Sequence, residues 1–351
     1  DPSSEGSPLS LYTLICGAKD SVVMDLGHPD AVAVLLAGVE RADILLLDEA
    51  AWRTLRQVLG DPATLKQSFP RLTVCVCSHF GASSPRAGWT GSEEIVQALS
   101  GVMSTTGHSG SGPVRIPGAL LTLSAAMFAV TSVLGDVVRK ERGGETAFLD
   151  CGAMQPAAAF LTAAYPSWFL ADAPPAAIGN RHGMSAPGHT FPCADGWVVI
   201  CAGNEPSWRR LCAVIGRPDL LADDRFLTAE TRVANVVALE VEISAWTRLY
   251  SISEVERMLD ENGIPAGLIA PLRDVLDHPQ FIARELLRQG PQGAIAGPAF
   301  RHNGEAVTPL GGRSTLGAAT ETVLGVWGLD APAFKRAARL GVFGKQIAKV
   351  A

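Results

Sequence analysis

The stretch ADILLLDEAAWRTLRQVLGDPATLKQSFPRLTVCVCS, residues 42–78, holds two apolar runs with a helical pattern between them. Its two ends, residues 42–47 and 72–78, are mainly apolar, which predicts two strands that are buried on both faces. Between them, residues 50–59 repeat apolar side chains at helical spacing. A buried strand, a helix and a second buried strand are typical of a parallel sheet covered by helices. The stretch therefore predicts an α/β fold with an open, doubly wound, Rossmann-like large domain.

Similar patterns extend in both directions from this stretch. Residues 21–26 predict a further strand, and residues 28–37 predict a helix of the same layered domain. Residues 168–192 are rich in Ala, Pro and Gly, and we interpret them as a linker between domains. The elements expected after the linker are a strand at 196–202, helices at 205–215, 238–247 and 253–262, the last capped by Ser253, and short helices at 320–328 and 333–340.

These patterns predict two domains. Residues 1–190 are expected to form the large α/β domain, and residues 301–351 are expected to pack back on it. Residues 191–300 show a different pattern of expected elements, a strand followed by helices, and predict a smaller α+β domain.

Composition and charge point to a globular protein that acts on small molecules. Of the 351 residues, 47% are hydrophobic and 18% are charged, and the net charge is −6. Because no basic stretch offsets this charge, nucleic acid and anionic membranes are not expected partners. Seven scattered cysteines predict reduced thiols of a cytoplasmic protein. No second Cys/His pair accompanies Cys75 and Cys77, so we expect no metal site.

Residues 116–135, IPGALLTLSAAMFAVTSVLG, carry no charge and just reach the length of a membrane span. Four hydroxyl side chains and four alanines lower the hydrophobicity of this segment, and no second candidate accompanies it. The helical pattern continues to residue 142 and ends at Gly143 and Gly144, with basic residues in the last turn. We therefore expect a buried helix rather than a membrane span.

Several motifs resemble the family III CoA-transferases, the group of formyl-CoA transferase, L-carnitine CoA-transferase and the α-methylacyl-CoA racemases. They are GNRH at 179–182, AP at 186–187, FPCADGWV at 191–198, WRRLC at 208–212, GRPDL at 216–220, DDRF at 223–226, RVAN at 232–235, GIPAG at 263–267 and HPQ at 278–280. Parts of 97–107 and 309–324 also resemble family segments. The resemblance implies an open α/β domain with a small domain, and a dimer whose two chains thread through each other. It also implies that CoA binds on the large domain.

In the family, an aspartate at the start of the apolar helix attacks the thioester and forms a mixed anhydride. The matching position here is Thr122, and no acidic residue lies within 116–135. A hydroxyl that lacks a dedicated base does not replace a carboxylate in this step. The alternative explanation of Thr122 is a helix-start residue whose side chain bonds the nearby backbone.

Two further departures from the family concern CoA binding. Family members open with a strand and a glycine-bearing turn that seat the nucleotide, and we expect this sequence to start after that unit. The Asn-Phe-Arg-Pro-Gly stretch expected after residue 47 is replaced by DEAAW at 48–52, whose two carboxylates would repel a phosphate. We expect weak or absent binding of coenzyme A by this chain alone, with Met24 and residues 48–52 beside the nucleotide if it binds.

The family's Ser-Gly-Phe-Gly turn matches Ser78, His79, Phe80 and Gly81, with histidine where glycine is usual. At the carboxyl end of a strand, His79 is either a general acid or base or a surface-loop histidine. Glu93 aligns with an acidic residue near the acyl pocket. Its other explanation is a charge that favours a helix N-terminus.

Two candidates of the linker region complete the predicted site. Gly188 and His189 take the position of a glycine-rich loop that shields the intermediate in formyl-CoA transferase. Because the stretch here is less flexible, we interpret it as a linker loop. Trp197 and Trp208 are interpreted as core residues.

The resemblance leaves three hypotheses about function. The first is a CoA-transferase-like protein of acyl-CoA metabolism whose catalytic centre is degenerate. It would form a homodimer and act on an acyl-CoA or a small carboxylic acid. The second is a non-catalytic subunit paired with an active paralogue in a heterodimer. The third is a repurposed enzyme that uses His79 or Glu93, for example in racemase-like proton transfer, although the histidine usual in the racemases corresponds to Ser92.

Overall fold

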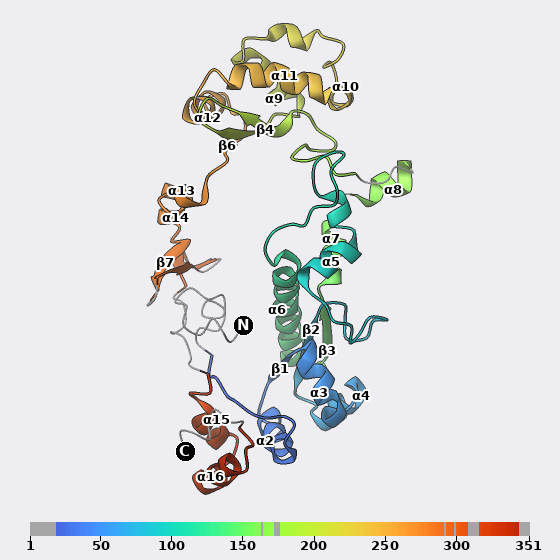
Figure 1. The fold of residues 1–351 in the computed structure, drawn as a ribbon, viewed down its shortest axis with the longest axis vertical. Helices are drawn as coiled ribbons and strands as arrows, with labels where there is room; N and C mark the ends of the chain where they lie inside the picture. Colours follow the sequence, from blue (N-terminus) through green and yellow to red (C-terminus); the bar gives the residue numbers. More distant parts are fainter. Residues whose placement is uncertain are drawn as a thin grey trace. The chain divides into compact units, whose positions relative to one another are not determined.

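The computed structural model describes residues 19–162, 164–171, 176–290, 293–297, 300–307 and 316–343 (Figure 1). The chain divides into two compact units. The first unit comprises residues 1–96, 119–159 and 276–351, and the second comprises residues 97–118 and 160–275.

A parallel sheet of three strands forms the centre of the first unit. The strands are β1 (Ile44–Asp48), β2 (Thr73–Ser78) and β3 (Phe148–Gly152), and they lie in the order β1-β2-β3. Ile44 pairs with Thr73, and Val74 pairs with Phe148. The parallel α/β fold expected from residues 42–78 is therefore confirmed.

Alternate residues of β2 face two different layers of helices. Val74 and Val76 pack in one cluster with buried residues of α3 (Glu49–Leu59) and α4 (Pro62–Ser68). Cys75 packs in another cluster with residues of α6 (Leu120–Glu141), and Cys77 borders this cluster. Because successive side chains of a strand point to opposite faces, helices cover both faces of the sheet at β2. The expected burial on both faces is wrong for β1, where Ile44 and Leu46 are exposed.

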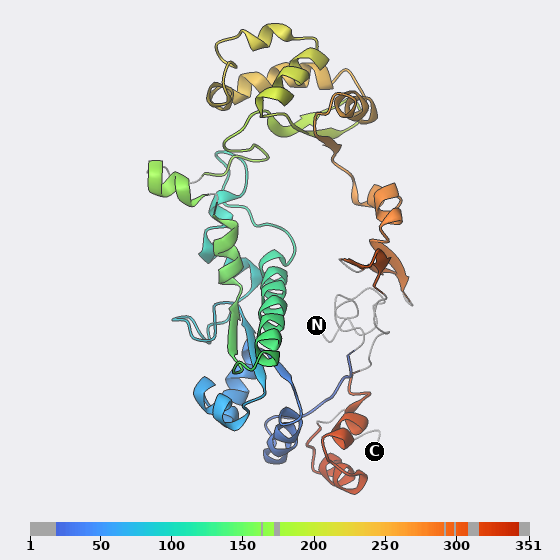
Figure 2. The same ribbon diagram turned by 180° about the vertical axis from the view of Figure 1, so that it is seen from behind.

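Helix α6 runs beside β2 and β3 within the first unit, as both views show (Figure 1, Figure 2). Its buried residues form a single stripe of Leu121, Ala125, Ala129, Val133 and Asp136. The expectation of a buried helix is thus right for one face only. The apolar side chains exposed in this chain include Leu123, Met127, Phe128, Val130 and Leu134.

Among the described residues, α6 is the one helix long and apolar enough to meet the length and composition of a membrane span. Core helices of water-soluble proteins meet the same criterion, and α6 packs a stripe of its residues against the sheet.

Asp136 fixes α6 to the sheet. Its side chain is buried, and it accepts hydrogen bonds from the Thr73 hydroxyl at 2.6 Å, Arg139 Nε at 3.1 Å and the Ala147 N–H at 3.3 Å. Burial by itself raises the pKa of Asp136, but these three donors outweigh it and lower the pKa below its usual value.

Residues 21–26 do not form the expected strand. Their backbone bonds go to the C-terminal segment: the Asp25 N–H donates to the Val342 carbonyl at 2.7 Å, and Ser21 O accepts from the Ala319 N–H at 3.1 Å. Val22 and Met24 border a core cluster made by helices α2 (Pro29–Val39), α15 (Thr320–Val326) and α16 (Ala331–Arg339). The segment is extended, but its partners are turns and helix ends instead of a neighbouring strand.

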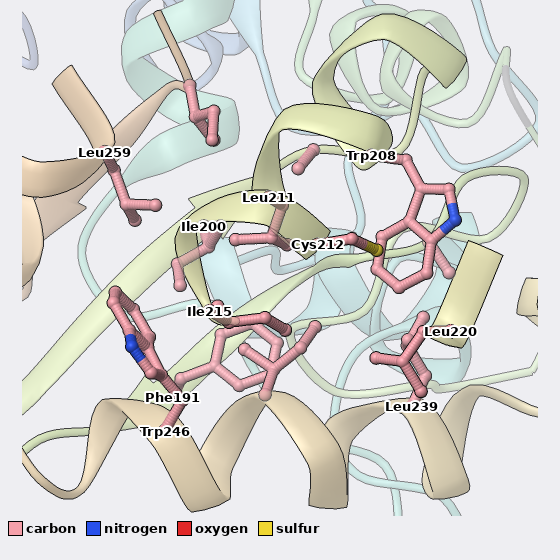
Figure 3. Close-up of a cluster of buried hydrophobic side chains, with 14 of the residues drawn as sticks. Phe191, Ile200, Trp208, Leu211, Cys212, Ile215, Leu220, Leu239, Trp246 and Leu259 are labelled. Atoms are coloured by element: carbon pink, nitrogen blue, oxygen red, sulfur yellow. The ribbon is translucent and has the colours of Figure 1, made fainter. Parts of the chain in front are cut away.

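The second unit contains an antiparallel sheet of β4 (Gly188–Pro192), β5 (Trp197–Cys201) and β6 (Ala266–Leu268). Its helices are α9 (Glu205–Val214), η3 (Pro218–Leu221), α10 (Ala229–Ala234), α11 (Val236–Thr247) and α12 (Ile252–Asp260). Figure 3 shows the core between the sheet and these helices, where Phe191 and Ile200 of the sheet meet Trp208 and Leu211 of α9.

Two local expectations in the second unit were wrong. Residues 188–192 belong to a strand that pairs with β5, so the linker interpretation fails for this part of 168–192. The N-cap of α12 is Ser251, which accepts from the Glu254 N–H, and not Ser253. The Ser251 and Glu254 side chains form a reciprocal capping box, which fixes the start of the helix at this position.

Arg232 of α10 lies completely buried in the second unit. It donates to the carbonyls of Ala186 at 2.9 Å, Phe226 at 3.2 Å and Gly203 at 3.2 Å. It also pairs with Glu205 at 2.7 Å, and its guanidinium carbon lies 5.5 Å from the Trp208 ring centre. One cation therefore joins three loops of the unit to its core.

The remaining elements are short. They are α5 (Glu93–Ser100), η2 (Met103–Thr105), α7 (Met154–Phe160), α8 (Tyr165–Ala171), α13 (Leu272–Val275), α14 (Pro279–Ala283) and the hairpin strands β7 (Leu287–Gly290), β8 (Gly293–Ala296), β9 (Arg301–His302) and β10 (Glu305–Ala306).

Candidate functional site

A cavity of about 430 Å³ opens in the first unit at the carboxyl ends of the three parallel strands. Open α/β sheets bind their ligands at this edge. The lining comes from strand ends (Asp48, Cys77, Ser78, Ala153), from α3 (Glu49, Ala50, Arg53), from the segment between β2 and α5 (His79, Trp89, Thr90, Gly91) and from the first turns of α6 (Thr122, Ala125, Ala126). The cavity therefore gathers His79, Ser78 and Thr122 from the predicted site.

Thr122 is exposed to this cavity near the N-terminus of α6. Its hydroxyl donates to Glu93 Oε2 at 2.7 Å, and its backbone N–H donates to the same oxygen at 2.9 Å. The other carboxylate oxygen, Oε1, accepts from the Leu121 N–H at 2.9 Å. The expected bond between Thr122 and its local backbone is therefore wrong, because the hydroxyl bonds a carboxylate from another helix.

Glu93 occupies the N-terminus of two helices at once. It is the first residue of α5, and its carboxylate satisfies free N–H groups of α6. Helix N-termini favour negative charge, so this position stabilises the carboxylate as an anion. Glu93 is not among the residues that line the cavity. The structure therefore supports the explanation of Glu93 as a helix-terminal charge, and it adds a contact to Thr122 that the sequence did not reveal.

His79 forms a pair with Glu49, a residue that the sequence analysis treated only as a source of negative charge. The His79 Nδ1 lies 3.5 Å from Glu49 Oε2, and the His79 backbone N–H also points to this oxygen at 3.5 Å. Glu49 Oε1 accepts from the Gly88 N–H at 3.2 Å and lies 4.0 Å from the Arg53 guanidinium. Both members of the pair line the cavity.

Phe80 and Gly81 shape the turn after β2 and do not line the cavity. Phe80 is buried, and Gly81 adopts a φ of 98°, which favours glycine. The Gly81 N–H donates to Ser78 Oγ at 2.9 Å, and Asp150 accepts from the Ala82 N–H at 2.8 Å. These contacts hold the turn against β3. Of the residues that match the family turn, Phe80 and Gly81 are therefore structural, and Ser78 lines the cavity.

Met24 borders the cluster of α2, α15 and α16 and is likewise absent from the lining of the cavity. A methionine packed among helices has no polar group to offer a nucleotide. Its proposed place beside CoA therefore gains no support from the described residues.

Gly188 and His189 belong to β4 in the second unit, where a separate cavity of about 710 Å³ lies. His189 lines that cavity together with Arg181 and Trp197. Arg181 donates to both carboxylate oxygens of Glu240 at 2.7 Å, which raises the pKa of Arg181. Trp197 is exposed, so its interpretation as a core residue was wrong, whereas Trp208 is buried as expected.

Cys77 brings a thiol to the wall of the first cavity. A hydrogen bond from the neighbouring Cys75 thiol lowers the pKa of Cys77 to about 7, although burial acts in the opposite direction. The six cysteines of the described residues are all free thiols. Within the same residues, no group of three or more His, Cys, Asp or Glu side chains could hold a metal ion.

Comparison with known proteins agrees with the resemblance carried by the motifs. The model of a family described as CoA-transferase family III matches residues 3–312. An acetyl-CoA:oxalate CoA-transferase of Acetobacter aceti is 32% identical over 79% of this chain and 72% of its own length. A succinate–glutarate CoA-transferase of Agrobacterium fabrum is 28% identical over 81% of this chain and 71% of its own length.

Solved structures show the same fold. A CAIB/BAIF family protein from Brucella suis has a TM-score of 0.76 at 24% identity, over 90% of this chain and 83% of its own. A Mycobacterium tuberculosis protein has a TM-score of 0.79 at 21% identity, over 91% of this chain and 87% of its own.

Proposed function

The chain belongs to CoA-transferase family III, and we propose that it takes CoA thioesters of small carboxylic acids but has no aspartyl nucleophile with which to transfer CoA. The observation that carries the proposal is Thr122. This residue occupies the aligned position of the nucleophile and lines the cavity. Its hydroxyl is already committed to the Glu93 carboxylate.

Glu93 does not supply the missing reactivity. A carboxylate that accepts several hydrogen bonds is stabilised as an anion, which weakens it both as a nucleophile and as a base. Both of its oxygens accept hydrogen bonds at the start of α6. It is therefore a poor base for the Thr122 hydroxyl and a poor substitute for an aspartate that faces the substrate.

The substrate class follows from the size of the cavity and from the relatives. A cavity of about 430 Å³ fits a small acyl group. The names of the relatives contain oxalate, succinate and glutarate, which are all short dicarboxylic acids. We therefore expect acyl-CoA esters of short carboxylic acids to bind, but weakly, because the carboxylates of Asp48 and Glu49 line the cavity and repel phosphate. Succinyl-CoA is the first to test.

A trapping experiment tests the absence of a nucleophile. The purified protein is incubated with succinyl-CoA and hydroxylamine, and the mass of the intact chain and of its peptides is measured. We expect no covalent adduct, because no free carboxylate occupies the position of the nucleophile. An acyl group, a CoA adduct or a hydroxamate on Glu93, Thr122, Cys77 or any carboxylate would contradict the proposal. A family member that carries the aspartate serves as the positive control.

The second part of the proposal is a partner chain over α6. One stripe of this helix packs on the sheet, while Met127, Phe128 and Leu134 on its other faces are more than half exposed in this chain. Such a large apolar surface on one helix supports association with another protein chain. We propose the interlocked dimer of the family, with a second copy or with an active relative.

Light scattering of the purified protein tests the partner chain. A dimer is expected, and a stable monomer would contradict the proposed covering of α6. Co-purification from the native host then distinguishes a homodimer from a heterodimer, because only the heterodimer co-purifies with a second family member.

A further inference from the structure

We infer that the Glu49–His79 pair is an acid–base dyad that directs water at a CoA thioester bound in the cavity of the first unit, so that the protein hydrolyses acyl-CoA. The inference rests on the proposed function, because it requires an acyl-CoA in this cavity.

Two departures from the family pattern meet in one contact. Histidine replaces glycine in the turn after β2, and Glu49 belongs to the DEAAW stretch that replaces Asn-Phe-Arg-Pro-Gly after β1. The two residues are 30 positions apart, yet Nδ1 of His79 lies 3.5 Å from Oε2 of Glu49. A third departure, Thr122, lines the same cavity. The changes therefore converge on one site and build a new pair there.

The surroundings of Glu49 and His79 hold the pair in place. The Glu49 side chain is only 16% exposed, and its Oε1 is held by the Gly88 N–H at 3.2 Å. Gly91 packs against the imidazole so closely that a Cβ at this position would lie 2.5 Å from the ring. The His79 side chain remains 35% exposed, so part of it is open to a ligand. A fixed carboxylate thus lies beside a partly accessible imidazole.

A carboxylate beside one ring nitrogen of histidine favours the proton on that nitrogen and leaves the other as the base. The free nitrogen takes a proton from water while the water oxygen bonds the thioester carbonyl carbon. The C–S bond then breaks, and the leaving CoA sulfur receives the proton from the imidazole. The products are a carboxylic acid and CoA thiol, and no further reactant is consumed.

Water, and not a carboxylate of the protein, is the acceptor of the acyl group. The carboxylates among the lining residues are Asp48 and Glu49. Asp48 caps α3 by accepting from the Ala51 N–H at 2.7 Å, and Glu49 is engaged by His79 and Gly88. Thr122 and Trp89 in the lining are exposed, so water reaches the cavity of this chain.

The experiment measures CoA release from succinyl-CoA without an acceptor acid, with a thiol-reactive dye and with ¹⁸O-labelled water. Binding of succinyl-CoA is measured separately by calorimetry. We expect the wild-type protein to release CoA and to place one ¹⁸O atom in the succinate. His79→Gln and Glu49→Gln should each lower kcat at least about tenfold, with KM changed less than about twofold. The double variant should be no slower than the slower single variant, as for groups that act as a unit.

His302→Gln is the matched control, because His302 is an exposed histidine of β9 that lines neither cavity. It should retain wild-type activity, and circular dichroism checks that every variant is folded. If succinyl-CoA binds but no CoA is released, or if deuterium enters the acyl chain from heavy water instead, the inference is overturned and the proposed function stands. Unchanged hydrolysis in His79→Gln also overturns it. If succinyl-CoA does not bind, the proposed function fails as well.

Discussion

Replacement of Thr122 by aspartate should raise CoA transfer from succinyl-CoA to a second carboxylic acid by at least about 100-fold. Loss of a nucleophile can lower the kcat of an enzyme by about a millionfold. A variant that regains only a small part of this factor would therefore still transfer CoA measurably faster than the wild-type protein. Thr122 already lines the cavity and stands near the N-terminus of α6, where the helix dipole favours a negative charge. A carboxylate here would attack the thioester carbonyl as the family aspartate does.

The matched control is Thr122→Asn, which has the shape of aspartate but cannot form an anhydride. Transfer is measured by chromatography of the two CoA esters, and covalent capture by the hydroxylamine procedure should now label residue 122. The new carboxylate would lie beside Glu93, and repulsion of like charges should lower stability, so folding is checked for both variants. Both variants must be folded and must bind succinyl-CoA. If they then transferred CoA at equal rates, residue 122 would not be the position of the nucleophile.

The Arg232→Met variant should lower the free energy of unfolding of the second unit by about 3–5 kcal/mol. Methionine preserves much of the length of the side chain but donates to none of the three carbonyls that Arg232 holds. Buried acceptors without donors each cost about 1–3 kcal/mol, and removal of one partner of a buried ion pair costs about 3–5 kcal/mol. The partner Glu205 is half exposed, so water compensates part of its loss.

Denaturant unfolding measures this effect, and hydrogen exchange followed by mass spectrometry assigns it to the second unit. Arg257→Met is the control in the same unit. Arg257 is exposed and pairs with Glu261, the C-cap of α12, four residues later, so its loss should cost no more than about 0.5 kcal/mol. If both variants lost the same stability, the three carbonyl contacts of Arg232 would not be its main role.

The sequence predicted the strands and helices that depend on local pattern. Residues 42–47 and 72–78 formed β1 and β2 within one or two residues, because their apolar runs favour strands of a parallel sheet. The run of β1 did not predict its burial, since Ile44 and Leu46 are exposed. Residues 21–26 carry a similar apolar pattern and yet form no strand. An extended segment becomes a strand only when a neighbouring strand accepts its backbone bonds, and here the C-terminal segment accepts them.

The candidate site was predicted in part. His79 and Thr122 were identified because they depart from a recognisable motif, and both line the cavity. The role of Glu49 was missed, since no spacing rule connects it to a histidine 30 residues later. One signal was present: a carboxylate directly after β1 and a histidine directly after the neighbouring strand β2 meet at the same edge of a parallel sheet. Gly188 and His189 lie in the second unit and line a different cavity.

By itself, the sequence determined the fold class and the identity of the candidate site residues. It predicted an α/β sheet, a threonine (Thr122) at the helix start where the family has an aspartate, and a histidine at the end of a strand. These properties are set by local periodicity and by the identity of single residues. Only the tertiary structure decided which carboxylate contacts which side chain. Glu93 accepts a hydrogen bond from the Thr122 hydroxyl, and Glu49 lies beside the His79 imidazole. Contacts of this kind depend on packing between segments far apart in the chain, and that packing depends on the whole core and not on any one stretch of residues.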